Sequence, residues 1–281
     1  MSERYKYNRE GYLNENFRMF HLRDTAGQER DFHFHEFDKI VILISGSVNY
    51  MVEGTDYTLE PWDILLVRHH MIHKALIDVS VPYERIIIYL DSAYAERFAP
   101  DGGLMDCFAE AEKRRFCLMR PDADEIEKLK DSLDRLEASI SDTEFGAELM
   151  RGTLLAQLMV QLNRIMQRDT SSKAASTEQS GKISAALSYI NENLTGSLSV
   201  DELAAMCYLS RYHFMRLFKQ QTGCTVHNYI RQKRLVLAAR LIREGMSASS
   251  AAAECGFTDY SAFHRAFSQT FGISPGKIKS S

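Results

Sequence analysis

The order of hydrophobic and polar residues divides the chain into three parts. Between residues 17 and 90, short apolar runs alternate with turns rich in Gly, Pro, Asp and Ser, which predicts β-strands. Between residues 93 and 168, apolar residues recur every three or four positions, as they do along one side of a helix. The same helical spacing returns in shorter segments after residue 182. The sequence therefore predicts an α+β fold.

The strands of the first part are short and follow one another closely. Short strands at nearly regular spacing are typical of a barrel or jelly roll. Amphipathic helices are predicted after them, at residues 122–140 and 145–166. Their apolar sides can pack on the barrel or against a second subunit, and the sequence leaves both arrangements open. The strands are predicted at residues 40–44, 48–52, 57–60, 64–68 and 83–90, with turns at 45–47, 53–56 and 61–63.

The last third of the chain contains one helix-turn-helix pattern twice. Residues 198–207 match residues 246–255 at an offset of 48, and residues 214–223 match residues 263–272 at an offset of 49. One residue is therefore added inside the second turn, and both sides still match. Two such copies in one chain give a monomer two contact points on duplex DNA.

Each copy is predicted to hold a short supporting helix and a second helix, called the reader helix. The reader helices span residues 211–221 and about 259–271, and a long helix at 226–244 sets their spacing at roughly 34 Å, one turn of DNA. Phe side chains occupy the inner sides, as in an ordinary helical core. Exposed Arg is usually only solvated, but here the whole outer array repeats in register. This repetition favours reading of the major groove, where Arg pairs with guanine.

We expect contacts to double-stranded DNA from the outer positions of both reader helices and from the long helix. Arg216 and Arg265 are expected to contact bases, so that replacing either with Ala costs roughly 1–3 kcal/mol at the matched site. Arg234 is assigned to a phosphate, with pairing inside the domain as the alternative. The expected DNA-binding residues are Arg211, Tyr212, Met215, Arg216, Lys219, Arg231, Tyr260, Ser261, His264 and Arg265.

Charge is divided unevenly along the chain. Residues 182–281 carry 12 Lys and Arg against 6 Asp and Glu, a net charge of +6. The rest of the chain carries 22 against 32, a net charge of −10. A basic C-terminal part attached to an acidic N-terminal part is the distribution expected of a phosphate-binding module.

The C-terminal part resembles the DNA-binding domain of the AraC/XylS family of transcription regulators. The resemblance rests on residues 209–223 and 256–275 and covers about a third of the chain. It implies a sequence-specific transcription regulator whose outer reader positions face the groove. The second copy has Ala248 and Ala251 where the family usually has larger aliphatic residues, and Ser268 where a Lys is usual. We therefore expect it to pack less well and to bind less tightly than the first copy.

The N-terminal part resembles the cupin-like barrel that precedes the DNA-binding domain in many AraC-type regulators. The matching positions include Gly46, the run 59–67 and several histidines. The resemblance implies a small-molecule effector inside the barrel. The alternative is a packed barrel that serves dimerisation alone, in a regulator that needs no ligand. The expected effector-binding residues are His33, His35, Tyr50, Trp62, Arg68 and His73.

Three of these histidines also raise the question of a metal site. His33 and His35 share one face of a predicted strand, and with His73 they offer three imidazoles. Metal-binding cupins have an acidic residue where this chain has Lys39 or Ile40, and Asp38, one residue off, should face the other side of the strand. A cation in that place argues against a tight metal site. We therefore expect no metal, cofactor or catalytic residue, and a metal-dependent cupin enzyme is the less favoured alternative.

Together these patterns predict a cupin-like effector-binding and dimerisation domain at residues 1–168, a polar linker at 169–181 and an all-α double helix-turn-helix domain at 182–281. The five cysteines lack metal-binding spacing and are expected to be reduced and buried. No apolar run approaches the roughly 20 residues that span a bilayer, and the N-terminus does not resemble a signal peptide. We expect a cytoplasmic homodimer with no membrane partner and with RNA polymerase as a further partner.

Overall fold

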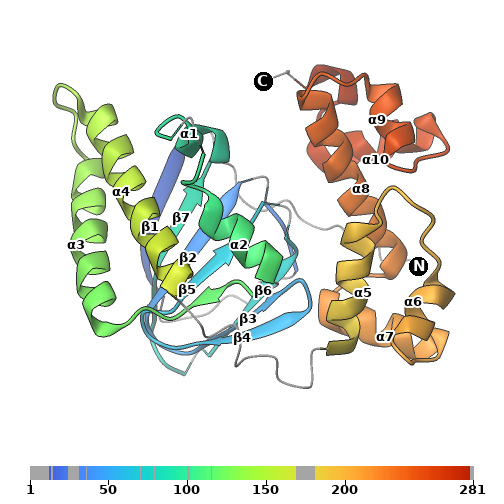
Figure 1. Cartoon of the computed structure of the whole chain (residues 1–281), viewed down its shortest axis with the longest axis horizontal. Coiled ribbons are helices and arrows are strands. Elements are labelled where there is room, and N and C mark those ends of the chain that lie inside the picture. The colour runs from blue at the N-terminus through green and yellow to red at the C-terminus, as the bar shows by residue number, and fades with distance from the viewer. Residues whose placement is uncertain are drawn as a thin grey trace. The chain divides into compact units, whose positions relative to one another are not determined.

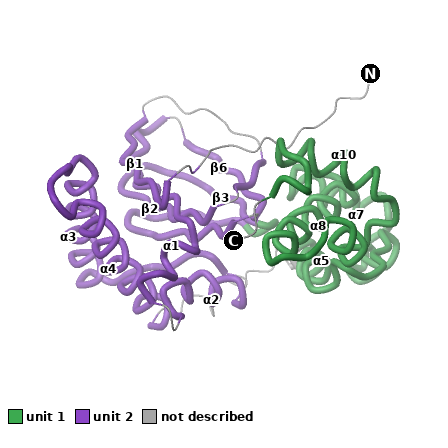
Figure 2. Tube along the Cα trace, turned by 90° about the horizontal axis from the view of Figure 1, so that it is seen from above, with its two compact units in different colours: residues 1–9, 53–55, 178–281 green, residues 10–52, 56–177 purple. Residues whose placement is uncertain are grey.

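The chain divides into two compact units, which mainly comprise residues 10–177 and 178–281 (Figure 2). Almost all of the predicted linker lies outside the described residues. The computed structural model describes residues 13–278 except Asn14, residues 25–31, Glu36, His70, Val79, residues 100–101, Arg115 and residues 169–180.

The first unit is built on two β-sheets (Figure 1). The larger sheet has the order β1-β7-β2-β5-β8 and the smaller one the order β4-β3-β6. The predicted strands are confirmed as β2, β3, β4, β5 and β7, whereas β1, β6 and β8 are additional. The strands are β1 (Phe17–Asp24), β2 (Asp38–Ser45), β3 (Val48–Val52), β4 (Thr55–Leu59), β5 (Ile64–Val67), β6 (His73–Ile77), β7 (Tyr83–Leu90) and β8 (Leu118–Met119).

Helices cover one face of the larger sheet. Asp122 and Glu125 form a reciprocal capping box at the start of α3, which fixes where that helix begins. Leu129 and Leu133 of α3 share a hydrophobic core with α4 and with the sheet. Both predicted helices therefore pack within the chain. The helices described in this unit are α1 (Ser92–Glu96), α2 (Asp106–Arg114), α3 (Ala123–Ile140) and α4 (Ala147–Arg168).

Strand β2 lies between two hydrophobic cores because its successive side chains point to opposite faces of the sheet. Ile40 belongs to the core shared with α3 and α4, whereas Val41 belongs to the core shared with the smaller sheet. Burial on both faces explains why this run is apolar without alternation. The same geometry places Lys39 on the side of Val41 and Asp38 on the opposite side, as the sequence predicts.

Every regular element described between residues 181 and 278 is a helix, and the α+β fold class is confirmed (Figure 1). Across the described ranges, every helix of the protein is too short or too polar to cross a membrane. The elements of this unit are α5 (Gly181–Glu192), α6 (Val200–Met206), α7 (Arg211–Thr222), α8 (Val226–Arg243), α9 (Ala248–Glu254), α10 (Tyr260–Phe271) and the short 3-10 helix η2 (Pro275–Lys277).

The internal repeat is confirmed helix by helix. The supporting helices α6 and α9 are related by an offset of 48 at both ends, and the reader helices α7 and α10 by an offset of 49. Each turn contains a residue in the left-handed conformation, Tyr208 at φ +55° in the first copy and Gly256 at φ +75° in the second. Glycine adopts this conformation without steric cost, whereas tyrosine does not.

Candidate nucleic-acid interface and effector site

The first reader helix, α7, turns its outer residues to solvent, because both of its ends are capped and its inner side is buried. The Ser210 hydroxyl accepts a hydrogen bond from the backbone N–H of His213 at 3.4 Å, and Gly223 ends the helix at φ +73°. Phe214 and Phe218 are fully buried. The predicted outer residues of this helix are all exposed: Arg211, Tyr212, Met215, Arg216 and Lys219.

The second reader helix, α10, is held in the same way. The Asp259 carboxylate accepts a hydrogen bond from the backbone N–H of Ser261 at 2.8 Å, and Gly272 ends the helix at φ +73°. Phe263 and Phe267 are fully buried. The predicted outer residues here are also exposed: Tyr260, Ser261, His264 and Arg265.

The two outer surfaces differ in charge. Three of the five outer residues of α7 are Arg or Lys, whereas Arg265 is the one Arg or Lys in α10. The Arg211 guanidinium forms an ion pair with Asp201 of α6 at 2.7 Å, and both side chains are more than half exposed. Such exposed pairs contribute little free energy, so Arg211 can exchange this carboxylate for a phosphate.

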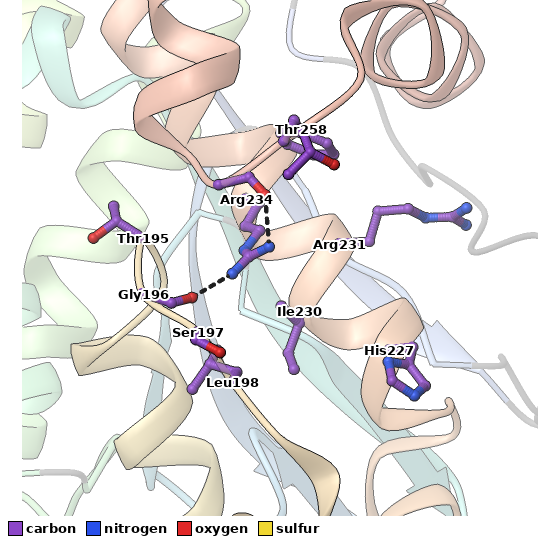
Figure 3. Close-up of a pocket in the computed structure, with 11 residues that line it drawn as sticks. Thr195, Gly196, Ser197, Leu198, His227, Ile230, Arg231, Arg234 and Thr258 are labelled. Carbon is purple, nitrogen blue, oxygen red and sulfur yellow. Dashed lines mark hydrogen bonds between the residues drawn. The ribbon is translucent and has the colours of Figure 1, made fainter.

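Arg234 of α8 joins three segments of the helical unit (Figure 3). Its guanidinium donates hydrogen bonds to the carbonyl oxygens of Leu194 at 2.8 Å, Gly196 at 2.7 Å and Gly256 at 3.0 Å. A Cβ atom on Gly256 would lie 2.9 Å from the Arg234 Cζ. The alternative of pairing within the domain is therefore confirmed for Arg234, because its side chain fastens the turn of the second copy to the loop before the first.

An open cleft of about 580 Å³ lies beside Arg234, and we call it the central cleft. Figure 3 shows its lining residues coming from three places in the sequence. Arg231 and His227 are exposed, and Arg231 donates a hydrogen bond to the Asn228 side-chain oxygen at 2.7 Å. The central cleft is lined by residues 195–198, residues 256–258, His227, Ile230, Arg231 and Arg234.

In the first unit, the three predicted histidines gather in one buried cluster. An isolated β-bridge pairs His33 with His73 through two backbone hydrogen bonds of 3.1 and 2.9 Å. The ring centroids of His35 lie 5.0 Å from His33 and 4.9 Å from His73. The ligating nitrogens of all three residues lie within 4.8 Å of one another. By donor type and spacing, these residues could hold a metal ion.

The cluster also contains an ammonium group. The Nδ1 atom of His73 lies 2.9 Å from the carbonyl oxygen of Met71, so this nitrogen carries the proton, and Nε2 faces the Lys39 ammonium at 3.5 Å. Burial, and then the positive charge of Lys39, hold the pKa of His73 well below its usual range. The neutral imidazole of His73 thus accepts a hydrogen bond from the Lys39 ammonium. A metal ion bound to His73 Nε2 would have to displace Lys39.

The other predicted effector-binding residues divide between this cluster and the helices. Tyr50 is buried, its ring centroid lies 5.8 Å from the Lys39 ammonium, and burial raises its pKa well above the ordinary value. Trp62, at φ +73°, packs on the core shared with α3 and α4. Arg68 forms an ion pair with Glu112 of α2. The structure thus gathers Tyr50 with the histidines, and it directs the contacts of Trp62 and Arg68 to the helices.

Comparison with known protein families identifies both parts of the chain. Residues 19–159 match the family described as the AraC-like ligand binding domain, and residues 203–281 match a helix-turn-helix domain family. The chain belongs to the AraC family of transcription regulators. Its two units accordingly provide a ligand-binding domain and a DNA-binding domain.

Relatives of this AraC-family regulator extend over nearly the whole chain. It is 25% identical to the transcriptional activator RhaS of Klebsiella pneumoniae over 249 residues, which cover 88% of this chain and 86% of that protein. It is 26% identical to the probable transcriptional regulator LumQ of Photobacterium leiognathi, covering 91% and 94%. An apo variant of ToxT from Vibrio cholerae aligns with a TM-score of 0.42 and 14% identity, covering 94% of this chain and 97% of that chain.

Two features of the AraC-family regulator escaped sequence reasoning. The central cleft combines segments up to 63 positions apart in the sequence, from Thr195 to Thr258, and only the folded chain brings them together. The hydrogen bond between Lys39 and His73 links residues 34 positions apart. The sequence draws attention to Lys39, a charged residue beside the apolar run at residues 40–44, but not to its partner.

Proposed function

We propose that the regulator binds its operator by placing α7 and α10 in two successive major grooves. The observation that carries this proposal is the repeat of the reader helices, in which four equivalent outer positions are exposed in both copies: 211 and 260, 212 and 261, 215 and 264, and 216 and 265. In this arrangement Arg216 and Arg265 contact bases, supported by Tyr212, Met215, Tyr260, Ser261 and His264. Arg211, Lys219 and Arg231 contact phosphates.

Capture of genomic DNA fragments by the intact protein tests this function. Enrichment of one motif with two contact blocks about one helical turn apart is the expected result. A matched control is the Arg240→Ala variant, which removes an exposed cation of α8 that pairs with Glu244. It should recover the same motif. Failure to enrich any motif would contradict the proposal.

We further propose that a small-molecule effector binds in the first unit beside His33, His35, His73 and Tyr50. Their imidazole and phenol groups offer hydrogen bonds in a buried setting. Trp62 and Arg68 were also predicted, but they contact helices on the other side of the sheet and lie outside the proposed site. The domain acts by binding and not by catalysis. A thermal-shift panel of metabolites should raise the melting temperature of the full chain with its effector. A panel without any shift would favour the alternative, a regulator whose barrel serves dimerisation alone.

A homodimer is proposed from apolar side chains that α3, α4 and their connection expose. Phe145 is fully exposed, and Leu149 and Met150 are 68% and 53% exposed. Exposed apolar patches of this kind often mark protein interfaces. A Leu149→Glu, Met150→Glu variant should run as a smaller species than the wild type in light scattering. Equal masses for both proteins would argue against this surface.

The proposed domain division is residues 1–168 and 182–281 with 169–181 as the linker. The regulator works in the cytoplasm, where its DNA is, and a bound dimer contacts RNA polymerase. Transcription of the captured genes in a purified system, with polymerase as the added component, tests the last point.

A further inference from the structure

The central cleft has the chemistry of an anion site. Arg231 and His227 are four positions apart, so they project from the same side of α8 (Figure 3). Side-chain hydroxyls of Thr195, Ser197 and Thr258 lie on the surrounding loops. Among the described residues that line the cleft there is no Asp or Glu. Cations and hydroxyl donors without a carboxylate suit a phosphate group.

Arg234 makes the floor of the cleft rigid and positive. Three of the five guanidinium N–H groups are used on backbone carbonyls, so this side chain cannot turn toward a ligand without breaking those bonds. Its charge nevertheless stays at the site. The loop at 195–198 and the turn at 256–258 are thereby held at a fixed separation.

The position of the cleft in the sequence of elements indicates which anion it meets. The loop at 195–198 leads into α6, and the turn at 256–258 leads into α10. In helix-turn-helix proteins the first helix crosses the DNA backbone and the start of the reader helix meets the bases. Because α8 joins the first reader helix to the second copy, we expect the backbone between the two grooves to pass α8 when α7 and α10 are both bound.

We propose that the central cleft binds phosphodiester groups of the DNA backbone between the two read grooves, with Arg231 and His227 as the donors that contact them. The proposal rests on the two-groove function given above, which already assigns Arg231 to a phosphate, and it deepens that function by placing this contact, together with His227, on the backbone between the two grooves. Such a contact fixes the register of both reader helices at once, because phosphate contacts position a protein without reading sequence.

Chemically modified DNA tests the proposal most directly. Methylphosphonate groups, which carry no charge, replace single phosphates in the segment between the two contact blocks of the recovered operator. The full-length wild type should lose affinity at one or two central positions, and the Arg231→Gln variant should no longer respond to those replacements. The Arg240→Gln variant, changed on the same helix outside the cleft, should respond as the wild type does.

Salt dependence gives a second, independent measurement. Each phosphate contact contributes about 0.9 to the slope of log K against log salt concentration, so Arg231→Gln should lower the slope by about that amount. Its affinity should fall equally for the operator and for single-base variants of it. Unchanged circular dichroism of the variant would show that the fold is intact, which the exposure of Arg231 leads us to expect.

The outcomes separate this proposal from the two-groove function. Central methylphosphonates that cost nothing, or that cost wild type and Arg231→Gln the same, overturn the cleft proposal while the readers still bind. If no operator is recovered, the slope on random duplex DNA still tests the cleft, because phosphate contacts do not depend on sequence. Stabilisation of the DNA-free wild type, but not of Arg231→Gln, by inorganic phosphate at constant ionic strength would reassign the cleft to a free anion.

Discussion

In the first helix-turn-helix copy the supporting helix buries Leu203 beside Ala204, and in the second the same place is taken by Ala251 beside Ala252. The second copy adds Phe271 to its core, and its ring centroid lies 4.5 Å from that of Phe267. The looser packing expected of the second copy stays a prediction. The backbones of the two copies agree because their helix caps and buried Phe positions agree, although other core side chains differ in size.

The outer surfaces of the two copies diverge much more than their cores. The first carries three cations on α7 and the second carries Arg265 alone on α10. Phosphate attraction depends on charge, whereas base discrimination depends on a few directed hydrogen bonds. We therefore expect the repeated scaffold to draw DNA affinity mainly from the first copy and base selectivity from both copies.

The largest expected effect tests whether the two helix-turn-helix copies have separate hydrophobic cores. Phe267→Ala should destabilise α9 and α10 by about 3–5 kcal/mol, because it empties a fully buried aromatic site. Phe218→Ala should do the same to α6 and α7. Amide hydrogen exchange, read peptide by peptide on the full chain, measures each copy by itself. Equal loss of protection in both copies from either variant would show that they share one core.

The next effect concerns the turn of the second copy. Gly256→Ala should destabilise that copy by about 1–3 kcal/mol, since a left-handed conformation is strained in alanine and the new Cβ would push on Arg234. Gly272→Ala is the control, because it has a similar φ and open space around it. Hydrogen exchange at residues 194–196 should increase in the first variant only. The same increase in the control would remove Arg234 from the explanation.

A smaller effect concerns the difference in surface charge. Lys219→Gln should lower the salt slope of DNA binding by about 0.9, the amount carried by one phosphate contact. Ser261→Ala should leave the slope unchanged and alter base preference instead. Titrations by fluorescence anisotropy at several salt concentrations give both values. A slope that responds to Ser261 and not to Lys219 would reverse the roles given to the two copies.

The smallest effect concerns the turn of the first copy. Tyr208 is 91% exposed and holds a left-handed conformation, so Tyr208→Gly relieves strain and removes little packing. We expect a gain in stability below about 1 kcal/mol, because the flexibility of glycine in the unfolded chain offsets part of the relief. Thermal unfolding of the full chain measures it. A clear loss of stability would show that the Tyr208 side chain makes a contact of its own.

The helical unit could be predicted from the sequence in more detail than the β-rich unit. A repeat aligns two copies against each other, so Ser210, Asp259 and the paired glycines fall at the same helix ends in both. Strand β6, His-Lys-Ala-Leu-Ile, has no clear alternation, and β8 has two residues that exist as a strand only through pairing with β5. Such strands depend on partners distant in the sequence.

The candidate sites follow the same division. Exposure of the reader positions follows from helical periodicity, which a sequence contains. The direction of Trp62 does not, because its left-handed turn sends the side chain toward α3, where Lys130 lies 5.1 Å from its ring centroid. Arg234 looked like a phosphate contact by charge alone, and its three carbonyl partners come from loops that no local pattern connects.

The most direct test of the central claim is selection of DNA from a random-sequence pool by the intact regulator and by its Arg216→Ala and Arg265→Ala variants. We predict a two-block motif for the wild type, with preference relaxed in one block by the first variant and in the other block by the second. Each relaxation should correspond to about 1–3 kcal/mol at one position. Variants that weaken all sequences equally, or that relax the same block, would contradict the claim that each helix reads its own groove.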